Sequence, residues 1–299
     1  MAYHIPALLP ETLAGLQIKP DGKYADATFG GGGHSRAILE LLGPDGHLYG
    51  FDQDSDARAN AFDDPRFTFT LSNFRFMQNF MRFYHVDGLD GILADLGVSF
   101  HHFDEGDRGF SFRTNAPLDM RMNRNAPLTA AELVATASEE ELLAMFRSYT
   151  DLSRPREVVK AIVRARSASP LLTTFQLADA VRPALNPKSE KKELSQVFQA
   201  LRIEVNHEMD ALREFLESTL AMLRPGGLLA ILTYHSVEDR MVKNFMKTGN
   251  VEGREEKDFF GRSESPWKLV TRKPVEASAE EVEANPRSRS AKLRIAEKL

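Results

Sequence analysis

The first hundred residues alternate between short apolar runs and stretches with the periodicity of amphipathic helices. We interpret the apolar runs as strands, which span 24–29, 47–52, 67–70 and 91–95. We interpret the stretches between them as helices, which span 35–42, 54–60 and 76–83. Strands that alternate with helices are typical of right-handed crossovers around a parallel sheet. The pattern therefore predicts an α/β domain in this part of the chain.

The alternation stops near residue 100. Residues 101–127 are rich in Asp, Arg, Gly and Phe and are expected to form a long ordered loop, and residues 128–202 show only helical periodicity. Helices are expected there over 131–135, 139–149, 156–165, 175–182 and 194–202. The α/β pattern then resumes, with helices over 206–223 and 238–246 and strands over 228–234 and 267–271. We therefore predict a first α/β part over 1–105, an inserted all-α domain over 106–203 and a second α/β part over 204–299.

Composition fits a globular protein and excludes several kinds of chemistry. The chain has 299 residues, 42% of them hydrophobic, which is enough to bury a core. It has no cysteine, so a cysteine nucleophile of the kind that cytosine C5 methyltransferases use is excluded, as is a Cys-bound iron–sulfur cluster. No run of about 18 apolar residues and no secretory signal is present, so we expect a cytoplasmic protein with no membrane partner. No set of His, Asp and Glu has convincing metal-ligand spacing, so we expect no metal.

Charge is unevenly distributed along the chain. The net charge of −5 argues against a uniformly basic nucleic-acid binder. However, residues 154–202 hold ten Lys or Arg against four Asp or Glu, and residues 285–299 hold five against one. Two basic segments on an acidic body indicate a localised anionic partner, although a solvated helical face explains the same counts equally well.

A glycine cluster, Gly30–Gly33, follows the first predicted strand and precedes the first predicted helix. Glycines in this place let the backbone approach a ligand, and the amides that begin a helix favour a negative group. Asp52 ends the next strand 20 residues beyond Gly32, the spacing at which a carboxylate accepts hydrogen bonds from a ribose. These features predict an adenosine-type ligand, and the alternative is a tight turn with an unrelated surface Asp.

Two observations favour S-adenosylmethionine over a dinucleotide. Asp26 lies within the first strand, where a carboxylate suits the cationic amino group of a methionine better than a pyrophosphate. The helical insertion also leaves no second nucleotide-binding half.

The fourth predicted strand ends in Asp95, at the edge where open α/β sheets place their chemistry. A carboxylate there can accept hydrogen bonds from an exocyclic amine during methyl transfer, or it can cap the loop or contact the cofactor. His235 follows the strand over 228–234 and would face the same crevice, although a lone histidine is more often structural. Asp95 is the first and His235 the second candidate for the catalytic acceptor.

The segment 108–113 interleaves arginine with phenylalanine. This pattern suits phosphate contact combined with base stacking, and it equally suits two core phenylalanines beside two paired arginines.

Taken together, a series of motifs that spans nearly the whole chain resembles the bacterial small-subunit rRNA cytosine-N4 methyltransferase family known as RsmH or MraW. The matching motifs, in family order, are 4–9, 26–30, 32–35, 52–54, 95–99, 108–112, 117–122, 198–206, 235–240 and 285–294. Several of them are long and unusual, so the resemblance is specific.

The resemblance implies a class I S-adenosylmethionine-dependent methyltransferase fold, Rossmann-like with a mostly parallel sheet and an inserted helical substrate-recognition domain. It implies methylation of N4 of a cytosine in the decoding region of 16S rRNA within the small ribosomal subunit, with S-adenosylmethionine as cofactor. By motif position, cofactor contacts fall on Gly32, Gly33, His34, Asp52, Phe74, Asp95 and His102. Substrate contacts are expected from Arg108, Phe110, Phe112, Arg113, Arg202, Arg287 and Arg289, the last two in a basic C-terminal tail. The oligomeric state is left open, with a homodimer among the alternatives.

The chain departs from the family pattern at three places. His102 stands where the family has a Gln, and a histidine can still donate or accept one hydrogen bond. Residues 192–197 replace the family's Pro-Ala-Thr-Arg-Thr, which removes an Arg that would contact RNA, and Val237 replaces a Leu. The alternatives are a methyltransferase of another nucleic-acid amine, a nucleotide-dependent oxidoreductase and a non-catalytic ribosome assembly factor.

Overall fold

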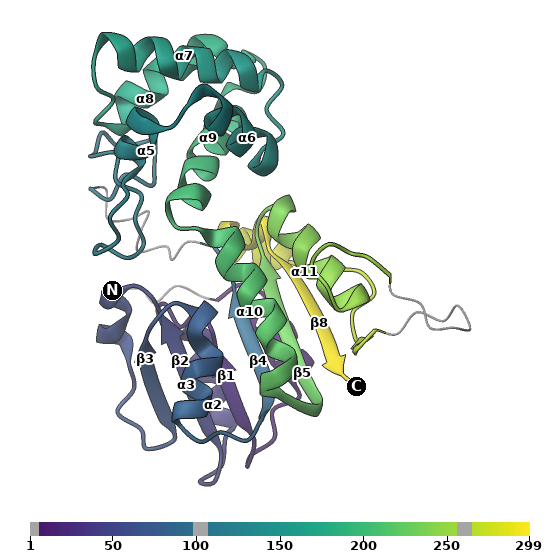
Figure 1. Ribbon diagram of the computed structural model, residues 1–299. Coiled ribbons are helices and arrows are strands. Elements are labelled where there is room, and N and C mark those ends of the chain that lie inside the picture. The colour runs from purple at the N-terminus through teal and green to yellow at the C-terminus, as the bar shows by residue number, and fades with distance from the viewer. Residues whose placement is uncertain (1–5, 98–106, 256–264) are drawn as a thin grey trace. The chain divides into compact units, whose positions relative to one another are not determined.

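The computed structural model describes residues 6–97, 107–255 and 265–299 and divides into two compact units (Figure 1). The first, here called the α/β unit, comprises Met1–Gly97 and Met209–Leu299. The second, here called the helical unit, comprises Val98–Glu208. Within the described ranges, no helix is long and apolar enough to cross a membrane.

The α/β unit is built on one sheet with the strand order β3-β2-β1-β4-β5-β8-β6, in which β7 also pairs with β8. The strands are β1 Lys23–Asp26, β2 His47–Asp52, β3 Phe67–Leu71, β4 Leu89–Asp95, β5 Leu223–Thr233, β6 Trp267–Leu269, β7 Val275–Glu276 and β8 Lys292–Lys298. The first five run parallel, and β8 runs antiparallel to its neighbours. This arrangement confirms the predicted α/β class with a mostly parallel sheet, and it brings the carboxyl ends of β1, β2 and β4 to the same edge.

The α/β unit also contains helices. They are α1 Leu9–Leu16, α2 Gly33–Leu41, α3 Met77–Phe83, α10 Glu208–Met222, α11 Ser236–Thr248 and α12 Ala279–Ala284, with the short 3₁₀ helices η1 Ser55–Asn60, η2 Phe74–Phe76 and η4 Pro286–Ser290. Of these, α1, α2 and α11 contact strands of the sheet. Figure 1 shows α10 lying across the face of the sheet at β4 and β5. The helix α1 contacts α2 as well as β4, β5 and β8, and the shared core includes the buried side chains of Leu16, Ile38 and Ile295.

The helical unit has a core of its own. Its helices are α5 Ala130–Thr136, α6 Glu139–Tyr149, α7 Pro155–Ala168, α8 Thr174–Val181 and α9 Glu190–Val205, with the 3₁₀ helix η3 Arg182–Ala184. Capping boxes begin α5, α6 and α8, each with a Ser or Thr that exchanges hydrogen bonds with a Glu or Gln three residues later. The apolar faces of these helices pack with Phe110, Leu118 and Met120 from the preceding segment.

Two expectations about the elements need correction. Residues 54–60 form a 3₁₀ helix from Ser55 to Asn60, and α1, α12, β7 and β8 were not predicted. The basic tail expected at the C-terminal end is largely a strand: β8 lies between β5 and β6. Arg294 of β8 is only 8% exposed and pairs with Asp239, whose Oδ1 is 2.7 Å from its Nε. Lys298 donates to the carbonyl oxygens of Leu220 and Leu223 at 2.6 and 2.7 Å.

Candidate active site

The glycine cluster and Asp52 form one hydrogen-bonded loop. The backbone amide of Gly30 donates to Oδ2 of Asp52 at 2.8 Å, and that of Asp54 donates to Oδ1 at 2.8 Å. Gly30 and Gly32 have φ of +51° and +74°, a backbone conformation that glycine adopts without strain. Among the described residues, a Cβ at Gly31 would meet no atom within 4 Å. The loop therefore presents bare backbone to open space.

The helix after this loop begins without a side-chain cap. Its N-cap is Gly32, which has no side chain that could accept a hydrogen bond from the first turn. The amides of such a first turn remain available to a ligand with negative or electron-rich groups.

Asp26 ties the first strand to this helix. Its carboxyl is 1% exposed, and it accepts hydrogen bonds from the hydroxyl of Ser35 at 2.7 Å and from the amide of Thr28 at 3.0 Å. Burial raises the pKa of Asp26, and these hydrogen bonds work in the opposite direction. Because Asp26 is buried, unlike Asp52, and both of its oxygens already accept hydrogen bonds, the arrangement favours a positioning role for Asp26 over a direct ion pair with a bound amino group.

The ends of β2 and β3 are joined through two amide side chains that the sequence analysis did not identify. Nδ2 of Asn73 donates to Oε1 of Gln53 at 2.8 Å, and Oδ1 of Asn73 accepts from the amide of Arg75 at 3.0 Å. This cap begins η2, which carries Phe74, and the Phe74 ring meets Phe215 edge to face at 5.2 Å. The sequence signals were the place of both residues just after a strand and, for Gln53, its position within the motif 52–54.

Asp95, at the carboxyl end of β4, is held from several sides. Its amide donates to Oγ1 of Thr28 at 2.6 Å, and the hydroxyl of Tyr234 donates to its Oδ1 at 2.7 Å. Nδ1 of His34 is 3.7 Å from its Oδ2. Burial raises the pKa of Asp95 to about 7, the hydrogen bond from Tyr234 lowers it and the charge of Glu238 raises it. The site thus contains a carboxyl that changes its protonation state near neutral pH.

His34 is 6% exposed, and its Nε2 is 3.1 Å from the carbonyl oxygen of Ala7. A carbonyl only accepts hydrogen bonds, so Nε2 carries the proton. Burial lowers the pKa of His34 and keeps the ring neutral, which leaves a lone pair on the Nδ1 that faces Asp95.

His235 is the N-cap of α11, and its Nδ1 accepts from the amide of Glu238 at 3.4 Å. Its Nε2 lies 3.0 Å from Oε1 of Glu238, and the two side chains are only 9% and 3% exposed. This placement favours a structural role for His235, and it is the preceding Tyr234 that reaches Asp95.

Three predicted substrate residues have side chains that are engaged inside the helical unit, and a contact between them and RNA stays a prediction. Arg108 and Phe110 are each 6% exposed, and Nη2 of Arg108 donates to the carbonyl oxygens of Arg121 and Met122 at 2.8 and 2.9 Å. Arg202 pairs with both carboxyl oxygens of Glu208 at 2.8 and 2.9 Å, and the two side chains are 12% and 11% exposed.

The remaining predicted residues are more accessible. Arg113 and Arg289 are exposed, and Arg287 and Phe112 are half-buried. The Phe112 ring meets Phe198 edge to face at 5.5 Å. His102 lies outside the described residues.

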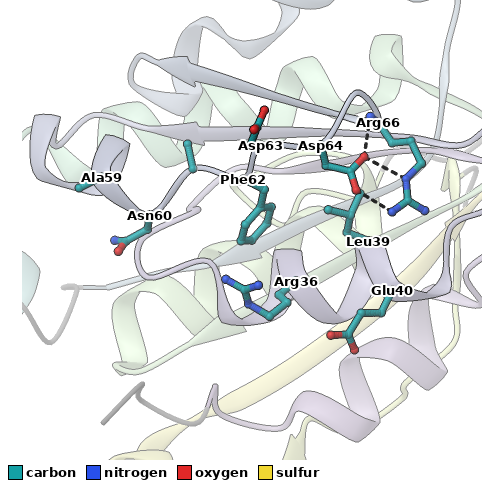
Figure 2. A pocket seen from close by; sticks show the side chains of 10 residues that line it. Arg36, Leu39, Glu40, Ala59, Asn60, Phe62, Asp63, Asp64 and Arg66 are labelled. Carbon is teal, nitrogen blue, oxygen red and sulfur yellow. Dashed lines mark hydrogen bonds and ion pairs between the residues drawn. The ribbon is translucent and has the colours of Figure 1, made fainter. Parts of the chain in front are cut away.

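A separate open pocket of about 480 Å³ lies beside α2 (Figure 2). In it the Arg36 guanidinium lies 4.6 Å from the centre of the Phe62 ring, and Arg66 pairs with Asp64 at 2.7 Å. Of the predicted cofactor residues, those that the structure describes do not line this pocket.

Comparison with known proteins gives matches over essentially the full chain. Residues 1–299 match the family model described as the MraW methylase family. The chain is 56% identical over 296 residues to a protein of Phocaeicola vulgatus named ribosomal RNA small subunit methyltransferase H, an alignment that covers 99% of this chain and 97% of that protein. It is 57% identical over 298 residues to the protein of the same name from Parabacteroides distasonis, with 99% and 98% covered.

Proposed function

Because the chain belongs to the MraW methylase family, we propose that it transfers a methyl group from S-adenosylmethionine to the N4 amine of a cytosine in the decoding region of 16S rRNA. The small ribosomal subunit is the proposed substrate and the cytoplasm the proposed place of reaction. The observation that supports the chemistry best is the carboxyl of Asp95, which stands at the same sheet edge as the glycine loop and has one oxygen directed away from its hydrogen-bond donor.

The residues of the glycine loop fit this cofactor. Open space in front of Gly31 and the uncapped first turn of α2 suit a ligand that approaches the backbone closely. When bound, S-adenosylmethionine supplies a methyl group on a positively charged sulfur, which is already a good electrophile. In this proposal Asp52 accepts hydrogen bonds from the ribose, Phe74 flanks the adenine, and the remaining contacts come from Gly32, Gly33, His34, Asp95 and His102.

Asp95 is the proposed acceptor for the substrate amine. The lone pair of a cytosine N4 is delocalised into the ring, and a carboxylate that accepts a hydrogen bond from the amine helps to localise it on nitrogen. The same oxygen can then take the proton that the amine has to lose. Rigid positioning of the acceptor contributes to the rate because little reorganisation is needed in the reaction.

RNA contact is proposed for exposed basic side chains. On α7, Arg156, Lys160 and Arg164 are exposed and follow one another at intervals of four residues, so they share one face of the helix. Arg113, Arg287 and Arg289 are further candidates, and Phe112 is a candidate for stacking on a base. Lys160 also pairs with Glu157 at 3.0 Å, an exposed ion pair of low strength that phosphate can compete with.

The test uses purified protein, methyl-labelled S-adenosylmethionine and small ribosomal subunits from a strain that lacks the activity. The RNA is digested, and the labelled nucleoside is identified by mass spectrometry. We expect label in N4-methylcytidine, bare or also ribose-methylated. Label in another nucleoside would keep the methyltransferase and reject the target, whereas cofactor binding without any transfer would favour a non-catalytic assembly factor.

A further inference from the structure

Tyr234 is fixed opposite Asp95 by the pairing of two central strands. In the parallel ladder of β4 and β5, Asp95 is in register with Leu232, and the amide of Leu96 extends the ladder by donating to the carbonyl oxygen of Leu232 at 3.0 Å. Tyr234 follows two residues later, and its hydroxyl reaches Oδ1 of Asp95 at 2.7 Å. The contact therefore follows from strand register and does not depend on a loop.

Contacts fix both the ring and the backbone of Tyr234. Its ring packs on Gly97, where a Cβ would lie 3.3 Å from Cδ2 of the ring, and Gly97 has a φ of +113°. Its amide donates to Oε2 of Glu238 at 3.0 Å, which links it to the first turn of α11. A ring fixed in this way presents its hydroxyl in one direction.

The groups around Asp95 explain why the hydrogen bond from the Tyr234 hydroxyl matters. The neutral His34 on α2 turns a lone pair towards Oδ2, and the carboxyls of Asp26 on β1 and Glu238 on α11 lie near enough to interact with Asp95 through their charges. Within the part of the chain that the structure describes, Tyr234 is the one side chain that donates a hydrogen bond to the Asp95 carboxyl.

We propose that Tyr234 is a positioning residue for methyl transfer, which binds Oδ1 of Asp95 so that the carboxylate stays ionised and its Oδ2 is presented to the substrate amine. This inference rests on the proposed function, because it assigns Tyr234 a role in that reaction.

The bonds and protons balance in the proposed transfer. The bond from sulfur to the methyl carbon breaks as the bond from N4 to that carbon forms, and N4 acquires the positive charge. Oδ2 of Asp95 takes one N4 proton, which leaves neutral N4-methylcytosine and a neutral carboxylic acid. Tyr234 keeps its own proton, because burial and the neighbouring Asp95 raise the pKa of its hydroxyl. Asp95 can pass its proton to water, since its side chain is 25% exposed.

The variant Tyr234→Phe removes the hydroxyl and keeps the ring that packs on Gly97. Loss of the hydrogen bond to the ionised carboxyl raises the pKa of Asp95 by about one pH unit. Because the ionised form accepts the proton, kcat/KM for RNA rises with pH through this pKa, and the wild-type midpoint is expected near 7. The variant should therefore lose about fivefold in kcat/KM at pH 7 and approach the wild type near pH 9.

The experiment measures this profile from pH 5.5 to 9.5 with methyl-labelled cofactor and small subunits. The Asp95 carboxyl is titrated in parallel by ¹³C NMR on the protein alone and assigned by its loss in Asp95→Asn. Tyr84→Phe is the matched control, because the Tyr84 hydroxyl bonds to Thr70 in the same unit at 2.9 Å and does not touch Asp95. Cofactor affinity is measured by calorimetry at pH 9, where Asp95 is ionised in the wild type and largely ionised in Tyr234→Phe, so it should be unchanged in both tyrosine variants and reports intact folding.

Two failures can be told apart. If the wild type methylates rRNA but Tyr234→Phe leaves both the kcat/KM midpoint and the carboxyl titration in place, the inference about Tyr234 is wrong and the proposed function stands. If the wild type transfers no methyl group to small subunits, the proposed function fails, and the role of Tyr234 in it fails with it. A uniform loss of kcat/KM at every pH would also reject the inference, because it would indicate a packing defect.

Discussion

Helices α5, α6 and α8 of the helical unit begin differently from α2 of the α/β unit. In the helical unit, α5, α6 and α8 each start with a capping box, so side chains satisfy the first amides of the helix. In the α/β unit, α2 starts at Gly32 with no side-chain cap, directly after the loop that holds Asp52. The first amides of α2 keep donors that a ligand can use, whereas amides of α5, α6 and α8 are engaged within the fold. The presence of a cap does not follow the unit, because α11 and α12 of the α/β unit have side-chain caps, whereas the N-cap residues of α7 and α9 in the helical unit make no such bond.

The charged side chains of the two units also differ in what they contact. The carboxyls of Asp26, Asp52 and Asp95 end neighbouring strands of the sheet, where the topology brings them together. Arginines of the helical unit act within it: Arg166 donates to the carbonyl oxygens of Val134 and Ala137 at the end of α5, and Arg202 holds Glu208. The comparison indicates that carboxyls gather at one edge of the sheet in the α/β unit, whereas Arg166 and Arg202 stabilise the helical unit.

The largest effect is expected at Asp95. The variant Asp95→Asn should lower kcat by about 10²–10⁴-fold, because the amide accepts hydrogen bonds but cannot take the amine proton. The matched control is Asp90→Asn at the opposite end of β4, where Asp90 interacts with Lys19 and Arg224. Single-turnover rates should drop in the first variant and not in the second. Equal rates in Asp95→Asn and the wild type would remove Asp95 from the chemistry.

The next effect separates structural from RNA-binding arginines. The variant Arg202→Met leaves the carboxylate of Glu208 without its partner in a mostly buried place, and we expect a loss of about 3 kcal/mol in the free energy of unfolding. Urea denaturation measures this loss, and Arg113→Met, at an exposed position, should change stability by less than about 0.5 kcal/mol. If Arg202→Met were as stable as the wild type but bound RNA weakly, the result would support the predicted contact between Arg202 and RNA.

A smaller effect is expected from the exposed face of α7. Replacing Arg156, Lys160 and Arg164 together by Gln should weaken RNA binding about tenfold at low salt and reduce the salt dependence by roughly 0.7 in log–log slope for each phosphate that the variant no longer binds. Lys268→Gln on the sheet is the control, because Lys268 pairs with Glu297. Filter binding at several salt concentrations gives both slopes. Cofactor affinity should not change, and an unchanged RNA slope would show that this face is only solvated.

The smallest effect tests the caps themselves. The variant Thr173→Ala removes the side-chain half of the capping box of α8 and should cost about 1 kcal/mol in the free energy of unfolding. Thr136→Ala, whose hydroxyl bonds to a carbonyl in the last turn of α5, should cost less. Methyl transfer should be unaffected by both substitutions. A change in kcat for Thr173→Ala would mean that the helical unit is not merely a scaffold for RNA contacts.

The sequence predicted the strand ends at this edge of the sheet because its signals there are local. Short apolar runs ended by Asp52 and Asp95 identify strand ends, and parallel topology then brings such ends together. The capping residues Thr129, Ser138 and Thr173 likewise stand where the helices begin. In each case the chemistry of a few neighbouring residues decides the structure.

Contacts between residues that are far apart in the sequence could not be predicted from such local signals. Tyr234 meets Asp95 only through the register of β4 with β5, and nothing in the neighbouring sequence indicates its partner. Arg108 and Phe110 fit an RNA-binding loop as well as a core, and only the packing distinguishes the two. In β8, basic residues alternate with Leu293 and Ile295. The basic charge of this segment therefore led to the prediction of a tail, although the segment forms a buried strand.

The position of β8 has a consequence for synthesis on the ribosome. This strand lies between β5 and β6, yet it follows every other strand of the sheet along the chain. The helical unit can form its core as soon as residue 208 has left the exit tunnel. One edge of β5, in contrast, stays unpaired until residues 292–298 have also emerged. Unpaired edges of apolar strands are prone to aggregate, so this interval is when a nascent chain most needs a chaperone. A chain that is truncated before residue 292 would therefore have a folded insertion and a sheet in which one edge of β5 is unpaired.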